Sequence, residues 1–450
     1  MYMSIFNKKE AAVLFIGDII LLYLALWLTL LLRYGVLPSS ESWHLHIYPF
    51  TILFVVWITV FFIAGLYEKH TLILRRRLPS ILLKVQIINS ALAVVFFYFI
   101  PYFNITPKTN LFIYLVLSFS LISGWRVFGV SIFGVRRKQK AILIGSGEEL
   151  VELKREVNGN SRYNLTFVSS IDLDEVAALD FEDEILNTIY SENIKTIVID
   201  LKNEKIEPIL PQLYNLIFFH VHFLDKYKVY EDIFDRIPLS LVGYNWSIEN
   251  ISKSSHIGYD VLKRGMDMTI SIITGIISLI LYPFIYIAIK IDDGGPLFFK
   301  AERVGENNHK IMLVKFRSMS TKSSGDGIEK EAYVTRVGKI LRKLRIDEIP
   351  QLWNVFRGDI SLVGPRPETP SLVKLYEKEI PYYNVRHLIK PGLSGWAQIY
   401  HKEHPHHGVA VSETKQKLSY DLFYIKKRSL ILDVKIALKT IKTLLSREGK

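Results

Sequence analysis

Two adjacent carboxylates in the last quarter of the chain, Asp347 and Glu348, have the chemistry to act on a phosphate group. They directly follow a basic segment, residues 339–345, and Pro350 comes just after them. A proline fits the first turn of a helix because the N–H that it lacks is unpaired there. We therefore expect Asp347 to be the N-cap of a helix, where the dipole stabilises an ionised carboxylate and attracts phosphate oxygens. In that position the pair could supply a nucleophile or a Mg²⁺ ligand, whereas most Asp-Glu pairs at helix starts only cap the helix.

Cations near this pair in the sequence could neutralise phosphate oxygens. Phosphoryl transfer depends mainly on in-line positioning and on charge neutralisation, and arginines hold oxygens in pairs. Arg366 stands between Pro365 and Pro367, so its backbone freedom is limited. The alternative for each cation is a solvated surface charge. The candidates for phosphate or nucleotide binding are Lys315, Arg317, Arg336, Arg342 and Arg366.

The composition indicates a membrane protein. The 450 residues are 50% hydrophobic, the mean hydropathy is +0.22 and the formal net charge is +12. This combination favours an anionic membrane surface or phosphorylated substrates as partners, and we expect no nucleic acid. The chain has no cysteine, which excludes disulfides, thiolate metal sites and a cysteine nucleophile.

Residues 1–136 contain apolar runs that are each near or above the length of a spanning helix. The first run is longer than the apolar part of a signal peptide, so we expect no removable leader. Lysine and arginine are concentrated before the first run, between the second and third, and after the fourth. By the positive-inside rule, both ends of this predicted four-helix transmembrane bundle face the cytoplasm. The runs are residues 11–32, 47–66, 81–100 and 111–135.

Ionisable residues within these runs are Asp18, Lys84 and Arg126. Charged groups inside a membrane are usually paired or functional. Lys84 is near enough to the end of its run to reach the interface. Asp18 and Arg126 fit either role equally well.

Short apolar strands that alternate with helical stretches predict a Rossmann-like α/β domain over residues 137–240, on the cytosolic side. The predicted strands are residues 141–144, 196–200 and 221–223. Gly145-Ser146-Gly147 follows the first strand as in a dinucleotide fingerprint, but Leu150 occupies the third glycine position and no clear acidic ribose partner follows. We therefore favour a structural or regulatory domain over a working cofactor site.

The polar stretch 237–259, with Pro238, Gly243 and Gly258, indicates a linker, which we place at residues 241–260, before a last domain, residues 261–450. The apolar run 266–291 is long enough for a fifth span, but such a span would place the basic residues after it outside the cell. Pro283 predicts a bend in this run. A kinked helix that enters and leaves by the cytoplasmic face satisfies both observations. We therefore expect a re-entrant membrane helix followed by a mainly helical domain.

Ordered sequence blocks extend through this last domain. They include Lys263-Arg264-Gly265-Met266-Asp267, Asp347-Glu348-Ile349-Pro350-Gln351, Gly364-Pro365-Arg366-Pro367, Lys390-Pro391-Gly392 and Tyr420-Asp421-Leu422. In content and order they resemble the bacterial sugar transferase family, the monotopic polyprenyl-phosphate phosphoglycosyl transferases that start capsule, exopolysaccharide and O-antigen repeat units. The preceding part of the chain looks like the N-terminal extension of the family's large members.

The resemblance implies a reaction in which a sugar-1-phosphate passes from a UDP-sugar to polyprenyl phosphate, in bacteria undecaprenyl phosphate. The products would be polyprenyl-diphosphate-sugar and UMP, in the first membrane step of bacterial polysaccharide biosynthesis. The resemblance further implies that Asp347 is the catalytic nucleophile and forms an aspartyl-phosphosugar, that Glu348 is a catalytic Mg²⁺ ligand, and that Arg342 and Arg366 bind phosphate.

The resemblance also implies a location. The protein would be a multi-pass protein of the bacterial cytoplasmic (inner) membrane, with its catalytic domain on the cytoplasmic face and membrane lipids as partners. A homodimer is possible, and the motifs do not indicate which sugar is transferred.

The sequence departs from the family's pattern at several positions. Arg345 replaces the Ser or Thr that is common two residues before the nucleophile. Tyr282 replaces the Ser that is common before Pro283, and Ser278 could substitute for its hydroxyl. After Gln398 the family usually continues with Asn-Gly-Arg, which is absent here. The tract His401, His404, His406 and His407 resembles a metal-binding cluster, although such tracts are more often solvated loops.

Two other classes of protein fit parts of the sequence. A non-catalytic membrane scaffold of polysaccharide assembly would use the N-terminal half, and a five-span lipid or sugar-phosphate transporter would place Lys450 outside the cell. The intact Asp347, Glu348, Arg342 and Arg366 argue against the scaffold. The distribution of positive charge argues against the transporter.

Overall fold

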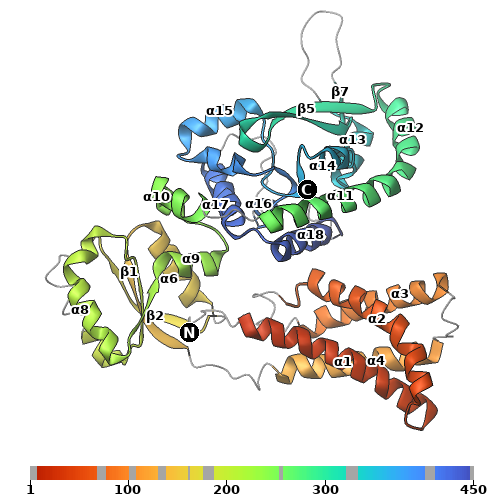
Figure 1. Cartoon of the computed structure of the whole chain (residues 1–450), viewed down its shortest axis with the longest axis horizontal. Helices are drawn as coiled ribbons and strands as arrows, with labels where there is room; N and C mark the ends of the chain where they lie inside the picture. Colours follow the sequence, from red (N-terminus) through yellow and green to blue (C-terminus); the bar gives the residue numbers. More distant parts are fainter. Residues whose placement is uncertain are drawn as a thin grey trace, which may run out of the picture. The chain divides into compact units, whose positions relative to one another are not determined.

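The computed structural model describes residues 8–67, 78–100, 108–129, 138–160, 163–175, 187–252, 257–320, 333–400 and 411–445. Its internal contacts divide the chain into two compact units, Met1–Asp232 and Ile233–Lys450 (Figure 1). The histidine tract at 401–407 lies outside the described residues.

The apolar runs of the first unit form long helices, as the hydropathy predicts. Each is long and apolar enough to cross a membrane. The fourth continues as a π-helical turn, Trp125–Gly129. The indole ring of Trp125 lies where a Cβ on Gly17 would stand, and its nearest atom is 2.5 Å from that position. Only glycine at position 17 therefore allows this close approach. The helices are α1 (Lys8–Tyr34), α2 (Ser40–Ile63), α3 (Leu78–Phe99) and α4 (Lys108–Gly124).

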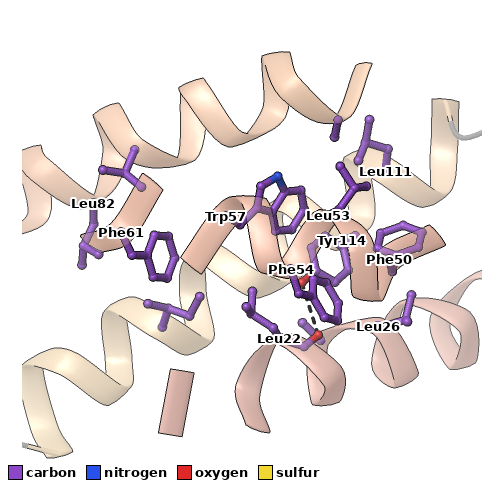
Figure 2. Packing of buried hydrophobic residues seen from close by; sticks show 14 of the residues in the cluster. Leu22, Leu26, Phe50, Leu53, Phe54, Trp57, Phe61, Leu82, Leu111 and Tyr114 are labelled. Atoms are coloured by element: carbon purple, nitrogen blue, oxygen red, sulfur yellow. Dashed lines mark hydrogen bonds between the residues drawn. The ribbon is translucent and has the colours of Figure 1, made fainter. Parts of the chain in front are cut away.

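These helices share one buried core that is rich in aromatic rings (Figure 2). The rings of Trp57 and Phe50 on α2 lie 5.3 Å and 5.2 Å from the ring of Tyr114 on α4, centroid to centroid. The hydroxyl of Tyr114 donates a hydrogen bond of 3.2 Å to the carbonyl of Leu22 on α1. Packing between large rings therefore joins three helices, and the only polar group of Tyr114 is satisfied.

Asp18 and Arg126, both buried, form an ion pair inside this core. The carboxylate of Asp18 also accepts a hydrogen bond of 2.7 Å from the hydroxyl of Tyr67, and Arg126 donates one of 2.7 Å to the carbonyl of Leu66. Of the two roles left open by the sequence, the structure shows pairing: the two charges compensate each other between α1 and the end of α4.

The rest of the first unit contains a four-stranded parallel sheet in the order β2-β1-β3-β4. The three strands expected from the sequence are present as β1 (Gln139–Gly145), β3 (Thr196–Ile199) and β4 (His222–Asp225). A further strand, β2 (Leu165–Asp172), was not predicted, because this edge strand alternates buried and more exposed positions and lacks a continuous apolar run. The helices are α6 (Glu148–Gly159), α8 (Leu210–Asn215) and α9 (Lys226–Phe234).

The second unit is a mixed α/β domain in which, over the described residues, helices predominate as expected, with short strands that the sequence did not predict. Its described strands form three two-stranded sheets, β5-β6, β7-β8 and β9-β10. The strands are β5 (Phe298–Val304), β6 (Lys310–Phe316), β7 (Met319–Ser320), β8 (Tyr333–Val334), β9 (Ser361–Val363) and β10 (Gly392–Ser394). The helices are α10 (Tyr244–Ser247), α11 (Ile257–Ser278), α12 (Tyr282–Asp292), α13 (Arg336–Lys343), α14 (Gln351–Arg357), α15 (Pro370–Glu379), α16 (Trp396–Tyr400), α17 (Val411–Lys427) and α18 (Leu430–Leu445).

In the segment 241–260, which the composition indicates as a linker, the described residues 241–252 and 257–260 are mostly helical. Trp246 on α10 is buried in the main core of the second unit, together with Tyr376, Trp396 and Leu422. Residues before α11 therefore pack in the same core as residues after α12.

The apolar run 266–291 forms a bent helical segment. A 3₁₀ turn, Leu279–Leu281, separates α11 from α12, and Pro283 lies in the first turn of α12. Figure 1 shows α12 leaving at an angle to α11. The hydroxyl of Ser278 donates a hydrogen bond of 2.7 Å to the carbonyl of Gly275, so it does satisfy a backbone group beside the bend. The helix is thus interrupted just before Pro283.

Candidate active site

Asp347 lies in a short 3₁₀ turn, Ile346–Glu348, and its side chain is buried. Arg345, directly before this turn, has left-handed backbone angles (φ 56°, ψ 19°), which are unusual for a residue other than glycine. Helix α14 begins only at Gln351, without a side-chain cap. The expectation that Asp347 is a helix N-cap is therefore wrong, because the chain reverses at Arg345 and turns once more before α14 starts.

Glu348 is the point on which several cations converge. Its Oε1 atom lies 2.9 Å from Nζ of Lys315 on β6 and 3.3 Å from a guanidinium nitrogen of Arg366. Its Oε2 atom lies 3.6 Å from a guanidinium nitrogen of Arg345. The fold thus brings together Lys315 and Arg366, predicted to bind phosphate, and Glu348, predicted to bind a metal ion.

The electrostatic environments of the two carboxyl groups differ. Burial alone would raise the pKa of Glu348, but Arg366, Lys315 and Arg345 outweigh it and lower the pKa to about 2. Burial, and then the negative charge of Glu348, raise the pKa of Asp347 above its usual value, against a smaller opposing effect of Lys315. In the described part of the chain, no group donates a hydrogen bond to the Asp347 carboxylate. Asp347 is therefore a buried carboxyl group with unused oxygens, beside a fixed anion.

A small polar cavity of 70 Å³ opens beside this cluster. Lys315, Arg366 and Arg303 line it, together with Glu348 and Glu368. Cations outnumber carboxylates there, so the cavity suits an anion such as a phosphate group. Sequence reasoning did not select Arg303, which β5 carries to the site.

The other predicted phosphate-binding residues do not contact Glu348. Arg342 on α13 donates to the hydroxyl of Ser318 at 3.1 Å, and its charge acts on Asp347. Arg317 forms an ion pair of 2.9 Å with Asp293. Arg336 is exposed at the first position of α13 and is not among the residues that line the polar cavity.

Backbone contacts hold Arg366 in place. The amide of Gly364 donates 2.9 Å to the carbonyl of Ser394, and the amide of Gly392 donates 2.8 Å to the carbonyl of Pro365. A Cβ on Gly392 would stand 2.0 Å from the nitrogen of Gly364, so the two segments can meet only because a side chain is missing. The turn that carries Arg366 is thereby fixed to β10.

A buried ion pair supports the same turn from the other side. Arg386 donates two hydrogen bonds, of 3.0 Å and 2.8 Å, to one carboxylate oxygen of Asp421. A terminal nitrogen of Arg386 also donates 3.0 Å to the carbonyl of Arg366. Both side chains are buried, so this pair fixes the backbone of Arg366 from inside the core.

The parallel sheet of the first unit holds the other site that the sequence suggested, after Gly145. There the Lys226 side chain is 1% exposed and lies where a Cβ on Gly145 would stand, with its Cδ atom 2.9 Å away. Its ammonium pairs with Asp200 at 2.9 Å and donates 3.1 Å to the carbonyl of Ser146. The carboxyl ends of β1, β3 and β4 are thus joined by the protein's own ion pair.

The second unit matches the family model described as bacterial sugar transferase over residues 258–447. An uncharacterized sugar transferase of Bacillus subtilis (strain 168), EpsL, is 37% identical over 192 residues, which cover 42% of this chain and 90% of the relative. The chain belongs to the bacterial sugar transferase family.

Two further relatives of this sugar transferase carry names that state a reaction. A UDP-N-acetylgalactosamine-undecaprenyl-phosphate N-acetylgalactosaminephosphotransferase of Aeromonas hydrophila is 43% identical over 199 residues, which cover 42% of this chain and 45% of the relative. An undecaprenyl-phosphate glucose phosphotransferase of Komagataeibacter xylinus is 38% identical over 195 residues, 41% of this chain and 36% of the relative. The alignments thus span less than half of these two relatives, and they differ in the sugar that they name.

The sugar transferase has a donor set that fits Mg²⁺ only in part. Within the described ranges, no group of three or more His, Asp or Glu residues could surround a metal ion. Mg²⁺ is often held by one or two carboxylates together with substrate phosphates and water, however. Glu348, with its low pKa, and the neighbouring Asp347 match that kind of site.

Proposed function

We propose that this protein transfers a sugar-1-phosphate from a UDP-sugar to polyprenyl phosphate, with release of UMP. The observation that carries the proposal is the convergence of Lys315 and Arg366 on Glu348, directly beside the buried carboxyl group of Asp347. Membership of the bacterial sugar transferase family and the names of two relatives support the same chemistry.

The proposed reaction has two displacements. In the first, a carboxylate oxygen of Asp347 attacks the phosphorus that bears the sugar; a P–O bond to Asp347 forms, and the bond to UMP breaks as UMP leaves with the electron pair. In the second, an oxygen of the lipid phosphate attacks the same phosphorus, a diphosphate forms, and the Asp347 carboxylate is released. The buried position of Asp347 limits its rotamers and keeps water away from the covalent intermediate.

The cations of the polar cavity would bind and orient the phosphates. Lys315 and Arg366 already lie within hydrogen-bond reach of Glu348, and Arg303 adds a third positive charge. A Mg²⁺ ion held by Glu348 would supply further charge neutralisation to the phosphate oxygens. Glu348 would then exchange one of its cation contacts for the metal, and Arg366 would be free to clamp a phosphate.

The bent segment α11–α12 supports a re-entrant membrane helix. On α11, Arg264 donates 2.7 Å to the carbonyl of Val355, and the Asp267 carboxylate accepts 2.7 Å from Ser361. On α12, the Asp292 carboxylate accepts 2.8 Å from the amide of Val337. Both arms are therefore tied to the same domain by polar groups.

The length of the arms agrees with this topology. Each arm has about a dozen residues between its polar anchors and the bend, a depth of roughly 18 Å at about 1.5 Å per residue. The hydrocarbon core of a bilayer is about 30 Å thick, so neither arm would cross it. The exposed apolar side chains at the bend, among them Ile280 and Phe284, would face lipid. With both ends of the four-helix bundle on the cytoplasmic side, the active site would lie at the inner face of the cytoplasmic membrane.

For the parallel sheet we propose a Rossmann-like domain without a dinucleotide. The Lys226–Asp200 ion pair occupies the ends of the strands where a cofactor phosphate would approach, and Glu148 and Glu149 add negative charge to the first turn of α6. This supports the structural or regulatory role that the sequence favours.

The test is an assay with the purified full chain in detergent or nanodiscs. The protein is incubated with Mg²⁺, undecaprenyl phosphate and a panel of UDP-sugars, and UMP is measured. We expect UMP with at least one donor, and loss of this activity in Asp347→Asn. Asp347→Asn keeps the size of the side chain, so full activity in this variant would refute the role of Asp347 as the nucleophile. Mass spectrometry of wild-type protein with donor alone should find the sugar-phosphate adduct on Asp347.

A further inference from the structure

A second cavity, of 260 Å³, also borders Glu348. Both cavities are lined by Glu348 and Leu393, so they meet at these two residues. The walls of the second cavity are mostly apolar and come from parts of the chain far apart in sequence: Ile349, Leu352, Leu393, Ile399 and Leu444. The site therefore offers a polar and an apolar compartment, joined at the proposed metal ligand.

Charge is confined to one side of this apolar cavity. Lys343 and Arg345 line it beside Glu348, and Arg345 Nη1 lies 3.6 Å from a Glu348 carboxylate oxygen. Two cations next to an apolar wall match a ligand with an anionic head and a hydrocarbon chain. A purely apolar ligand would gain nothing from the two cations.

The hydroxyl groups of the cavity are already engaged. Ser394 and Thr440 are hydrogen-bonded to each other at 2.5 Å, and Thr443 donates 3.1 Å to the carbonyl of Lys439. The side-chain oxygen of Gln398, which also lines the cavity, is buried and has no hydrogen-bond partner in the described residues. With one unpaired acceptor among mostly apolar walls, the cavity suits a hydrocarbon better than a nucleobase, which needs several directed partners.

We propose that the apolar cavity binds the first isoprenoid units of the lipid acceptor, with Lys343 and Arg345 beside the acceptor's phosphate. The inference rests on the function proposed above and adds the place of the second substrate. The polar cavity then serves the phosphates of the UDP-sugar, and after UMP has left, the acceptor phosphate attacks the Asp347 adduct in line, from the side on which UMP departed. Binding of the hydrocarbon next to the head orients the phosphate oxygen for the second displacement.

The two displacements can be measured separately, which tests this division. Thr443 and Leu444 on α18 are exposed and line the cavity, so Thr443→Trp and Leu444→Trp would fill it from the surface, with little disturbance of the core. Ile441→Trp adds a similar ring on the same helix, at an exposed position that does not line the cavity. It is the matched control.

The first readout is the burst of UMP from UDP-sugar alone, which reports the first displacement. The second is the KM for undecaprenyl phosphate in steady state. We expect wild-type burst amplitude in all three variants, a KM for the acceptor raised at least tenfold in Thr443→Trp and Leu444→Trp, and an unchanged KM in Ile441→Trp. Thermal melts identify a cavity-filling variant that fails to fold, and the other of Thr443→Trp and Leu444→Trp then provides the test.

Other outcomes overturn the inference in distinct ways. An unchanged acceptor KM in a folded filler variant would show that the lipid chain binds elsewhere. Loss of the UMP burst in the fillers but not in Ile441→Trp would assign the cavity to the donor. No burst in the wild-type protein would instead refute the proposed function itself, and the inference with it.

Discussion

The ammonium of Lys315 lies 2.9 Å from a carboxylate oxygen of Glu348, and both side chains are largely removed from solvent. This contact joins β6 to the turn that carries Asp347, and it is the shortest of the three cation contacts of Glu348. The contact gives Lys315 two roles at once: it keeps Glu348 ionised, and it contributes charge to the polar cavity.

Lys315→Gln is therefore expected to reduce kcat by about 10- to 100-fold, since a hydrogen bond to a charged group is worth roughly 1.5–3 kcal/mol. Lys315→Arg should recover part of the rate because it keeps the charge. Steady-state release of UMP measures both variants. If Lys315→Gln keeps the wild-type kcat, Lys315 has only a structural role.

Gly392→Ala should damage the active site without altering any charged residue. The added Cβ would stand 2.0 Å from the nitrogen of Gly364, so the segment that carries Arg366 must move away from β10. We expect kcat to fall at least tenfold, with the protein still folded by its thermal melt. Gly265→Ala on α11 is the matched control, because no atom lies within 4 Å of its added Cβ. Equal rates in the two variants would contradict the close approach of Gly364 and Gly392.

Hydropathy and motif spacing were sufficient to predict the helices of the first unit, the bend at Pro283 and the carboxylate pair. They predicted wrongly that Asp347 is a helix N-cap. The left-handed backbone of Arg345, which turns the chain there, depends on contacts made after folding, and no local signal such as a glycine marks it. Strand alternation suggests that Lys315 and Arg317 share a face, but β6 ends at Phe316. Arg317 therefore turns toward Asp293, which comes from the end of α12.

Residues that meet only in the folded chain were beyond sequence reasoning for a different reason. Arg303 reaches the polar cavity from β5, and Arg386 reaches the backbone of Arg366 from a distant 3₁₀ segment. Their sequence neighbourhoods contain no paired carboxylates or phosphate motif. Only the pairing of β5 with β6, and the packing of the segment around Tyr383, bring them to the site.

The Arg386–Asp421 pair is expected to couple stability to catalysis. Removal of one partner leaves a buried charge without compensation, which costs roughly 3–5 kcal/mol. Arg386→Leu and Asp421→Leu should each lower Tm strongly, whereas the double variant should lose less than the sum of the two. Additive losses in this double-mutant cycle would contradict direct pairing.

Arg386→Lys separates the two roles of Arg386. A lysine keeps a positive charge for Asp421, but it cannot reproduce the guanidinium fork that also donates to the carbonyl of Arg366. We expect a folded protein with a reduced kcat and a KM for UDP-sugar that changes less. A variant with a wild-type kcat would show that the hydrogen bond to Arg366 does not position the turn.

His387 should make the second unit sensitive to acid. The ring is buried, neither nitrogen has a hydrogen-bond partner in the described structure, and Tyr383 packs edge-on against it. Burial, and then the positive charge of Arg386, lower the pKa of His387 to about 4. In the unfolded chain the pKa is about 6.5, so the unfolded state binds a proton first as the pH falls. Stability contributed by the neutral ring is therefore complete above about pH 6.5 and is lost between about pH 6.5 and pH 4.

His387→Phe removes this titration and keeps a ring of similar shape against Tyr383. We expect the Tm of the wild-type protein to fall more between pH 7.5 and pH 5 than the Tm of His387→Phe, with the two curves parallel above about pH 7. His222→Phe is a suitable control because His222 is exposed on strand β4. Thermal melts of the three proteins across this pH range are the measurement. Identical pH profiles for wild type and His387→Phe would mean that the buried imidazole takes up its proton as readily in the folded protein as in the unfolded chain.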